Sequence, residues 1–277
     1  RGVGMTMGAF VMERTLDLLA ERLGLDPAEI RRRNLIARDA YPFTSAAGFV
    51  YDSGDYPKAL EMALELAGYD ALKRERDEAR TRGRLLGVGI SCYTEYTGMG
   101  SATYRQRGMV EVPGPEAARV SVEADGTVRC RLSFSSQGQG HATTAAQIVA
   151  DELGVPLEQV VVSQPDTDET PKGSGTFASR GAIALSGAAG AAAVTLKARI
   201  LDAAGGLLEA SPADLVLNGG RVSVRGMPDR GVTLAEVAGA VGPVSLEVTE
   251  RFDPPGPTFS GAVHVASVEV DAETGRV

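Results

Sequence analysis

The sequence has only two cysteines and two histidines, the side chains that most often bind transition metals in proteins. Cys92 and Cys130 stand far apart and form no C-x-x-C pair. Ordinary buried thiols are therefore expected at both positions, rather than a redox or metal-binding motif. The same shortage predicts that this chain holds no metal site of its own and no iron–sulfur cluster.

The sequence also lacks an excess of positive charge and long uninterrupted apolar runs. Its formal net charge of −8 gives it no long-range attraction for phosphate backbones or anionic lipids. No apolar run approaches the roughly 20 residues that span a bilayer, and the N-terminus has no basic-then-apolar signal pattern. These absences predict a soluble, cytoplasmic protein that binds neither nucleic acid nor membranes.

The apolar content of the sequence is sufficient for a large core. Its 277 residues are 43% hydrophobic and 23% charged, which fits one large domain or two smaller ones. The chain opens on Arg1 without an initiator methionine, and it closes on "VASVEVDAETGRV", a strand and a turn without a return strand. We therefore expect an internal piece of a longer polypeptide.

Helix signals dominate the first 82 residues. Apolar spacing predicts a helix over 8–23 that ends at Gly24, and Asp26 followed by Pro27 is a typical helix start. The run Arg31–Arg33 is expected on the solvated face of that second helix. Residues 41–57, rich in Pro, Gly, Ser and aromatics, indicate a connector and a domain boundary. Two further helices are predicted over 57–68 and 70–82.

From Gly83 onward, strands and helices are mixed. Residues 85–98 predict a buried strand, and "ARVSVEADGTVRCRLSF" predicts a β-hairpin that turns at Asp125–Gly126. We also predict helices over 141–153, 179–208 and 234–240, a strand at "EQVVVS", and strands over 215–224, 246–252 and 261–270. Because regular βαβ alternation is missing, the expected fold class is α+β, with mixed sheets and packed helices.

Two loops have the composition of ligand-binding segments. "SSQGQG" (135–140) and "TPKGSGTFASRG" (170–181) are rich in Gly, Ser and Thr, and each leads into the start of a predicted helix. Unpaired backbone N–H groups and the helix dipole favour anionic or oxygen-rich ligands there. Neither loop has the ending of a Walker A motif, and G-x-G-x-x-G is absent. A generic nucleotide-binding module therefore stays open only as a weak alternative.

The first loop contains two glutamines separated by one glycine. Gln137 and Gln139 each carry an uncharged amide with donors and an acceptor, and in an extended backbone they would project to the same side. Such a pair suits a large ligand with ring nitrogens and carbonyls. The alternative is a solvated polar loop without a ligand.

"SSQGQGHATTAAQIVADELGVPLEQVVV" and "DTDETPKGSGTFASRGAIALSGAA" resemble the molybdopterin-binding region of the molybdenum hydroxylases, the family of xanthine oxidase, aldehyde oxidase and carbon monoxide dehydrogenase large subunits. Further segments extend the resemblance over nearly the whole chain: "RGVG", "FVMERTLDLLAERLGLDPAEIRRRNLI", "YDSGDYPKALEMALELAGYD", "GRLLGVGISCYTE" and "HVASVEVDAETGRV". It implies that residues 1–55 are the helical tail of a first molybdopterin-binding domain with a connector. Residues 56–277 would be a second such domain, truncated at its C-terminal end.

The resemblance also implies the site residues. The cofactor-binding set is Gln137, Gly138, Gln139, Gly140, His141, Thr176, Ser179 and Arg180. Arg180 would offer a charged fork to a phosphate. The opening Arg1, Gly2, Val3 and Gly4 match the family's active-site loop. Gly2 stands where copper–molybdenum carbon monoxide dehydrogenases have a copper-binding cysteine, which disfavours that activity.

The implied reaction is hydroxylation of an aldehyde or N-heterocycle, a small-molecule substrate, with oxygen from water. The implied cofactor is molybdopterin with molybdenum, with the cytosine dinucleotide form favoured. FAD and 2Fe–2S clusters would lie on partner subunits, an FAD subunit and an iron–sulfur subunit, in an oligomeric full-length enzyme. The general-base glutamate is expected downstream of this chain, so neither Glu95 nor Glu169 is assigned that role. The alternative is that the piece alone is a folded, inactive scaffold without cofactor.

Overall fold

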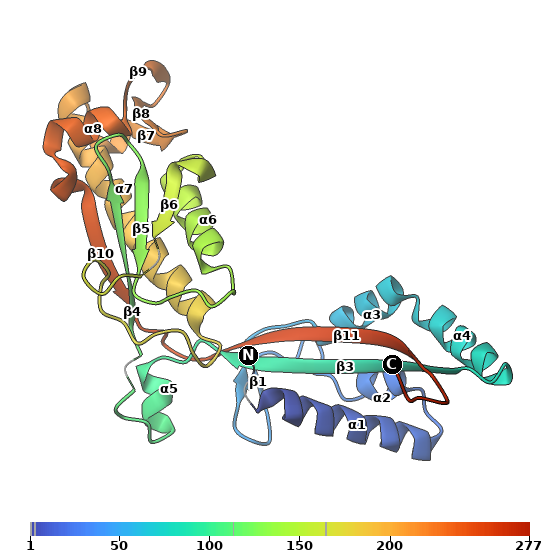
Figure 1. The fold of residues 1–277 in the computed structure, drawn as a ribbon. Coiled ribbons are helices and arrows are strands. Elements are labelled where there is room, and N and C mark those ends of the chain that lie inside the picture. Colours follow the sequence, from blue (N-terminus) through green and yellow to red (C-terminus); the bar gives the residue numbers. More distant parts are fainter. Residues whose placement is uncertain (1, 3, 113, 164) are drawn as a thin grey trace. The chain divides into compact units, whose positions relative to one another are not determined.

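The chain forms two compact units (Figure 1). The computed structural model describes residues 2, 4–112, 114–163 and 165–277. Unit 1 consists of Arg1–Tyr96 and Thr258–Val277, and unit 2 consists of Thr97–Pro257. Unit 2 is thus inserted in the sequence between two segments of unit 1. The boundary predicted near residue 55 falls inside unit 1, and it stays a prediction because it divides the sequence by family domain rather than by contacts.

The helices of unit 1 follow the sequence signals closely. α1 (Met5–Leu23) starts three residues earlier than predicted and ends at Gly24, whose backbone is left-handed. In α2 (Pro27–Arg32) the side chain of Asp26 accepts a hydrogen bond of 2.7 Å from the amide of Ala28, as its N-cap role requires. α3 (Tyr56–Ala67) and α4 (Tyr69–Thr81) are also present as predicted, joined at Gly68.

Two long strands form the sheet of unit 1. β3 (Leu85–Thr97) pairs with β11 (Thr258–Val270), and α3 packs against β11. A small core gathers under these elements from Ala28, Leu60, Leu64, Tyr69 and Ile90. Inside the predicted connector, β1 (Phe43–Thr44) and β2 (Val50–Tyr51) form a short antiparallel pair.

α1 is attached to unit 1 by its polar side. Arg31 is 1% exposed, and its Nε donates to Glu13 Oε2 at 2.8 Å while its Nη2 donates to the carbonyl of Ile90 at 3.0 Å. Glu13 Oε2 also accepts from the amide of Cys92 at 2.8 Å. The prediction that Arg31 lies on a solvated face is therefore wrong, because α1 supplies a carboxylate that the local sequence does not reveal. Arg32 and Arg33 are exposed as predicted.

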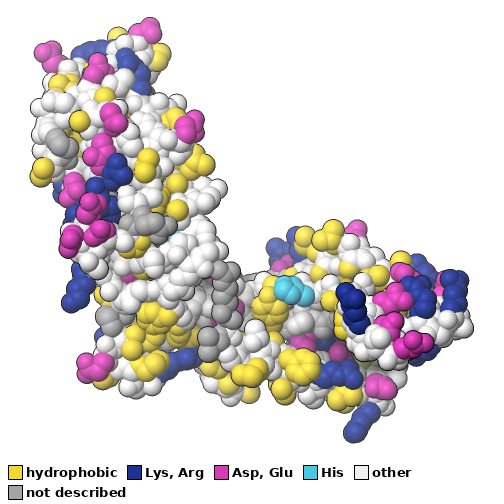
Figure 2. Space-filling model, viewed as in Figure 1, with side chains coloured by type: hydrophobic (Ala, Val, Ile, Leu, Met, Phe, Trp, Pro, Cys, Tyr) yellow, Lys and Arg dark blue, Asp and Glu magenta, His cyan; other side chains and the backbone are white. Residues whose placement is uncertain are grey.

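The apolar side of α1 faces outward. Of its described residues, Glu13 and Ala20 are buried, whereas Met7, Phe10 and Met12 are 69%, 71% and 64% exposed. Figure 2 shows hydrophobic side chains on the surface over this helix. The apolar spacing thus predicted the helix correctly, but its apolar side does not pack within unit 1.

Unit 2 is built on a four-stranded sheet in the order β10-β4-β5-β6. β10 (Glu247–Phe252) and β4 (Glu116–Val122) are antiparallel, and β4 forms the predicted hairpin with β5 (Val128–Leu132). β5 and β6 (Val160–Ser163) run parallel and are connected through α6 (His141–Leu153). Alternate strand residues face the helices and form the core, among them Val120, Val128 and Cys130, each fully buried.

The long helix α7 (Gly181–Leu208) packs against α6, β4 and β10. Its buried side is lined largely by alanines, which let the neighbouring elements approach closely. Among the described residues, it is the one helix whose length and composition would suffice to cross a membrane. The prediction that no apolar run approaches the length of a membrane span was therefore wrong. The packing of α7 in the core of unit 2 accounts for its apolar composition.

A small antiparallel sheet completes unit 2. β7 (Leu215–Asn218), β8 (Arg221–Val224) and β9 (Met227–Thr233) lead into α8 (Leu234–Val241), which begins with a capping box between Thr233 and Glu236. α5 (Ser101–Gln106) and β9 were not predicted, and three short 3-10 turns lie at Leu157–Gln159, Pro212–Asp214 and Pro243–Leu246. Mixed sheets with packed helices confirm the predicted α+β class.

Candidate functional site

One edge of the unit 2 sheet collects both of the loops singled out in the sequence. Because β5 and β6 are parallel, the loop that follows each strand leaves the sheet at the same edge. The loop after β5 leads to α6, and the loop after β6 leads to α7. β4 is antiparallel to β5, so its first residue, Glu116, lies at this edge too. We call this region the carboxyl edge.

The glutamine loop is exposed and turns back on itself. Gln137, Gly138, Gln139 and Gly140 are all exposed. Gly138 and Gly140 have φ of 97° and 78°, the left-handed region that glycine adopts without a penalty. The expectation that an extended backbone projects both glutamines to one side is therefore wrong. Instead, the side-chain oxygen of Gln139 accepts a hydrogen bond of 2.5 Å from the amide of Gln137.

His141 lies beneath this loop rather than on its surface. It is 5% exposed, and its ring meets that of Phe134 edge-on at 5.2 Å. A Cβ at Gly181 would lie 2.7 Å from His141 Nε2, so the starts of α6 and α7 approach closely only because that residue is glycine. Burial lowers the pKa of His141 below 6.5, against a smaller opposing effect from the backbone of Ser135. The imidazole at the start of α6 therefore favours its neutral form and packs against the start of α7.

The second loop is hydrogen-bonded to the first. Thr176 Oγ1 donates to the carbonyl of Ser135 at 2.5 Å. Beyond it, Phe177, Ala178 and Ser179 are exposed. Ala178 and Ser179 have φ of 52° and 51°, a conformation that is strained for residues with a side chain, by roughly 1–3 kcal/mol each. Such strain persists only where the surrounding structure fixes the backbone.

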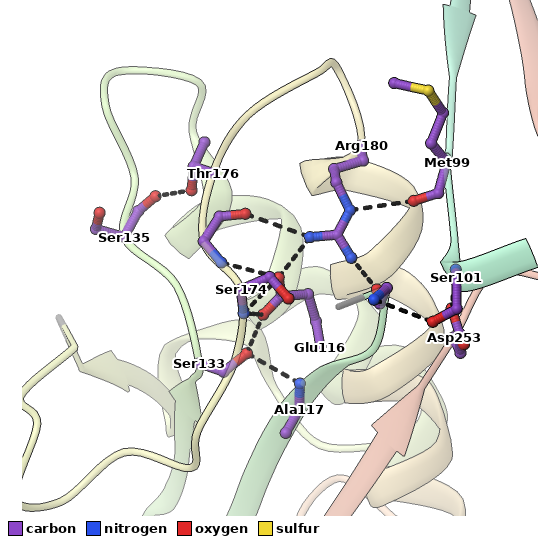
Figure 3. Close-up of polar contacts among 12 residues, drawn as sticks. Met99, Ser101, Glu116, Ala117, Ser133, Ser135, Ser174, Thr176, Arg180 and Asp253 are labelled. Carbon is purple, nitrogen blue, oxygen red and sulfur yellow. Dashed lines mark hydrogen bonds and ion pairs between the residues drawn. The ribbon is translucent and has the colours of Figure 1, made fainter. Parts of the chain in front are cut away.

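Arg180, the next residue, has its side chain in the interior (Figure 3). Its guanidinium is 0% exposed, and its Nη1 contacts Glu116 Oε1 at 2.5 Å while its Nε donates to the carbonyl of Met99 at 3.2 Å. It also donates to the carbonyls of Gly114 and Gly175. The expectation that this side chain offers its charge to a phosphate does not fit this arrangement, because its donors are directed to protein oxygens and its surface is enclosed.

The carboxylate of Glu116 gathers donors from both loops. Ser133 Oγ donates to Oε2 at 2.5 Å, and the amides of Ser174 and Gly175 donate to Oε1 at 3.1 and 3.0 Å. A Cβ at Gly173 would lie 2.1 Å from Glu116 Oε2, so the loop passes over the carboxylate only with glycine there. Sequence reasoning missed Glu116. The available signal was one acidic residue at the first position of a largely buried strand, "EAARVSV".

Two helices begin at the carboxyl edge with their N–H groups toward the loops. Among the described residues, no side chain caps the start of α6 or of α7. The positive ends of both helix dipoles are therefore left to a ligand or to water. Together with the exposed amides of the glutamine loop, this edge suits an oxygen-rich ligand with neutral hydrogen-bonding groups and an anionic part.

The remaining predicted residues belong to unit 1 or fall outside the described chain. Arg1 and Val3 lie outside the described residues. Gly2 has φ of 61°, and Gly4, with φ of 75°, is the N-cap of α1. Both adopt the left-handed region, so this opening segment depends on glycine at each position.

The described residues include no group of metal ligands and no thiol with a lowered pKa. Within residues 2, 4–112, 114–163 and 165–277, no three or more His, Cys, Asp or Glu side chains group together as a metal site would require. Cys130 is buried and Cys92 partly buried, both as free thiols. Burial raises the pKa of Cys92 to about 11 and that of Cys130 to about 12, which keeps both protonated. The described residues of the carboxyl edge offer a ligand hydrogen-bond donors and acceptors.

Comparison with known proteins gives consistent matches. Residues 62–277 match a family model described as a molybdopterin cofactor-binding domain, and residues 1–35 match a second model with the same description. The chain is 36% identical to the nicotine 6-hydroxylase large subunit of Paenarthrobacter nicotinovorans, over 100% of this chain and 35% of that protein. It is 33% identical to the carbon monoxide dehydrogenase large chain of Afipia carboxidovorans, over 98% of this chain and 35% of the relative.

A solved structure agrees with these relatives. The crystal structure of quinoline 2-oxidoreductase from Pseudomonas putida 86 superposes with a TM-score of 0.83 at 38% sequence identity. The match covers 97% of this chain and 35% of that one. The chain thus spans about a third of the length of the proteins it resembles.

Proposed function

The chain belongs to the molybdopterin cofactor-binding domains of the molybdenum hydroxylase family, and on that premise we propose that the carboxyl edge of unit 2 holds part of a molybdopterin cofactor. The activity is proposed for the longer polypeptide to which this chain would belong. That activity is the hydroxylation of an aldehyde or N-heterocycle with oxygen from water. Relatives named for nicotine and quinoline support an N-heterocycle as the substrate class.

The observation that carries the proposal is the hydrogen bond between Thr176 and the carbonyl of Ser135. It joins the two ligand-type loops into one exposed surface at the edge where α6 and α7 begin. Exposed residues on this surface are Gln137–Gly140 and Phe177–Ser179. Backbone donors and uncharged amides are the groups that a polar ring system with a phosphate-bearing tail requires, so the residues present fit the cofactor.

Five of the predicted residues then divide into two groups, one at the surface and one below it. Gln137 and Gln139 hydrogen-bond the pterin ring, and the N–H groups at the starts of α6 and α7 bind the anionic tail. Ser179 is exposed on the same surface. His141 and Arg180 act from below by holding the two loops. When bound, the molybdenum cofactor supplies the oxidation chemistry, and the general base is proposed to be a glutamate downstream of this chain.

The finer assignments belong to the same proposal. Residues 1–55 are the tail of a first cofactor-binding domain, 56–277 are a truncated second one, and Arg1–Gly4 form the active-site loop. The cofactor is the cytosine dinucleotide form, and FAD and 2Fe–2S clusters lie on partner subunits of a cytoplasmic oligomer. The words "large subunit" and "large chain" in the names of relatives support such partners. Gly2, where a copper-binding cysteine is expected, disfavours oxidation of carbon monoxide.

The test is cofactor content. The chain is produced in a host that makes molybdopterin, and bound pterin is measured by fluorescence after oxidation, with molybdenum measured by elemental analysis. Gln137→Ala and Gln139→Ala should each lower the bound pterin about tenfold, equivalent to about 1.4 kcal/mol of lost hydrogen bonding. Gln147→Ala is the matched control, because Gln147 is exposed on α6 outside the loop, and it should retain the wild-type content.

A second outcome separates the scaffold alternative. If the isolated chain folds but retains no pterin, whereas the longer polypeptide retains it and loses it on Gln137→Ala, the chain alone is an incomplete scaffold. If neither protein depends on Gln137 or Gln139, the proposed site is wrong.

A further inference from the structure

Glu116 and Arg180 form a buried ion pair whose remaining contacts come from the loops of the carboxyl edge. Glu116 is 1% exposed and Arg180 is 0% exposed. The donors to Glu116 are Ser133 Oγ, the amides of Ser174 and Gly175, and Arg180 itself. The protein oxygens that accept from Arg180 include the carbonyls of Met99, Gly114 and Gly175. In Figure 3 these groups converge on the carboxylate and the guanidinium from different segments of the chain.

An ion pair of this kind contributes little to stability by comparison with an apolar pair of the same shape. Desolvation of both charges offsets most of their attraction, so stability alone does not explain its presence. What the pair does is determine the path of one short segment. Gly175 is held at one end through its amide and its carbonyl, and Arg180 is the other end.

The segment between those two anchors contains the strained backbone. Residues 176–179 include the left-handed Ala178 and Ser179, and the amide of Arg180 donates to the carbonyl of Phe177 at 3.3 Å. Thr176 fixes the same segment to the glutamine loop through Ser135. Without an anchor at each end, nothing among these contacts would hold Ala178 and Ser179 at positive φ, and the segment would relax to an unstrained conformation.

We propose that Glu116 and Arg180 are positioning residues: they hold residues 176–179 in the strained conformation that presents this segment to the cofactor, without contacting the cofactor themselves. The inference rests on the proposed function of the carboxyl edge. It replaces the sequence-based role of Arg180 as a phosphate ligand with an indirect one, and it adds Glu116 to the site. Loss of an outer partner that orients a metal ligand typically costs about 10–100-fold in affinity, and we expect a loss of the same order here.

The main variant is Glu116→Gln, which keeps the shape of the side chain and removes its charge. Bound pterin per chain should fall about 10–100-fold, and amide hydrogen exchange in residues 175–180 should accelerate. Arg180→Lys should act in the same direction, because lysine cannot reproduce the planar fork.

Two controls accompany these variants. Val120→Ala is the control for destabilisation, because Val120 is fully buried on the same strand as Glu116. This substitution should lower the stability of unit 2 while the protein retains pterin. Glu123→Gln is the control for a partly exposed ion pair on the same sheet and should have no effect on pterin.

A rescue separates positioning from simple structural support. Glycine adopts positive φ without strain, so Ala178→Gly in the Glu116→Gln background should recover part of the lost pterin. If Glu116→Gln does not fold, Ser133→Ala serves instead, because it removes one donor to Glu116 and leaves the ion pair. It should cause a smaller loss in the same direction.

The outcomes distinguish this inference from the function on which it rests. A wild-type protein that binds no pterin, alone or in the longer polypeptide, would overturn the proposed function. A wild type that binds pterin, with Glu116→Gln, Arg180→Lys and Ser133→Ala all retaining it at the level of Val120→Ala, would overturn the positioning role alone.

Discussion

Arg31 in unit 1 and Arg180 in unit 2 are both enclosed arginines paired with a glutamate, yet their surroundings differ. Arg31 bonds to Glu13 and Asp17 on α1 and to the carbonyl of Ile90 on β3. The side chains of Glu13 and Asp17 are 12% and 25% exposed. Arg180 pairs with Glu116, whose side chain is 1% exposed, and bonds to loop carbonyls.

The difference shows that a buried arginine–glutamate pair can have two different structural roles. Where the partners lie on helices and strands, as for Arg31, the arginine fixes the arrangement of elements that are already rigid. Where loop carbonyls are bonded beside a single strand residue, as for Arg180, the proposed role is to impose a conformation that the loop would not keep by itself. A buried arginine near a predicted site should therefore be judged by the kind of element that supplies its partners.

Of the changes that test this difference, the largest loss of stability is expected in unit 2. Glu116→Ala leaves Arg180 buried without a carboxylate partner among the described residues, which should destabilise unit 2 by about 3–5 kcal/mol. Chemical denaturation, with hydrogen exchange in β4 and β5 to assign the change to unit 2, measures this. A loss below about 1 kcal/mol would mean that the pair is not enclosed as described.

The equivalent change in unit 1 should be milder. Glu13→Ala leaves Arg31 with Asp17 at 2.9 Å, and water can reach part of the site. The amide of Cys92 loses its acceptor, so a loss of about 1–3 kcal/mol is expected. Hydrogen exchange in α1 and β3 assigns the change to unit 1. A loss as large as that of Glu116→Ala would remove the distinction drawn between the two arginines.

The two units should also differ in their response to acid. The folded pKa of His141 lies below its unfolded value of 6.5 because burial disfavours the charged ring. As the pH falls below about 6.5, His141 becomes protonated in the unfolded state but stays neutral in the folded state. Unit 2 therefore loses stability as the pH falls from about 6.5 to the folded pKa. Denaturation at pH 7.5 and 5.5 should show this loss in the wild type and less of it in His141→Gln.

Unit 1 should respond only in stronger acid. Burial raises the pKa of Asp26, but hydrogen bonds from Lys73 and from the amide of Ala28 outweigh it and leave the pKa below 3.8. Its contribution is therefore present above pH 3.8 and is lost as the pH falls through the folded pKa. Asp26→Asn should remove this acid-sensitive step without changing the step in unit 2.

The smallest effect is expected for an exposed arginine. Arg84 makes two hydrogen bonds to Glu269, of 2.7 and 2.6 Å, but the two side chains are 49% and 46% exposed. Arg84→Ala should change the melting temperature within measurement error, and any change should vanish at high salt because exposed charges are screened. A change comparable to that of Glu13→Ala would show that pairing, rather than burial, governs these arginines.

Local signals were sufficient for the elements of the fold that local physics determines. The Asp125–Gly126 turn predicted the β4–β5 hairpin, and Gly24, Asp26 and Pro27 predicted where α1 ends and α2 begins. The order of the sheet was not accessible in this way, since β10 pairs with β4 across more than a hundred residues.

The site was predictable only on its exposed side. The composition of the two Gly-rich loops indicated ligand binding, and in the structure a hydrogen bond from Thr176 to the carbonyl of Ser135 joins them. The role of Glu116 and the burial of Arg180 were not predictable, because each charge is compensated by a partner 64 positions away in the sequence. Burial of a charge is decided by such a partner, and the neighbouring sequence does not contain it.

The pairing of β3 with β11 has a consequence for synthesis of the chain. All of unit 2 lies between these two strands in the sequence. At translation rates of about 5–20 residues per second, β3 leaves the ribosome roughly 8–35 s before its partner exists. For that time it is an unsatisfied edge that other nascent chains can join. Variants that slow the folding of the inserted unit should therefore reduce soluble yield in the cell before they affect the finished protein.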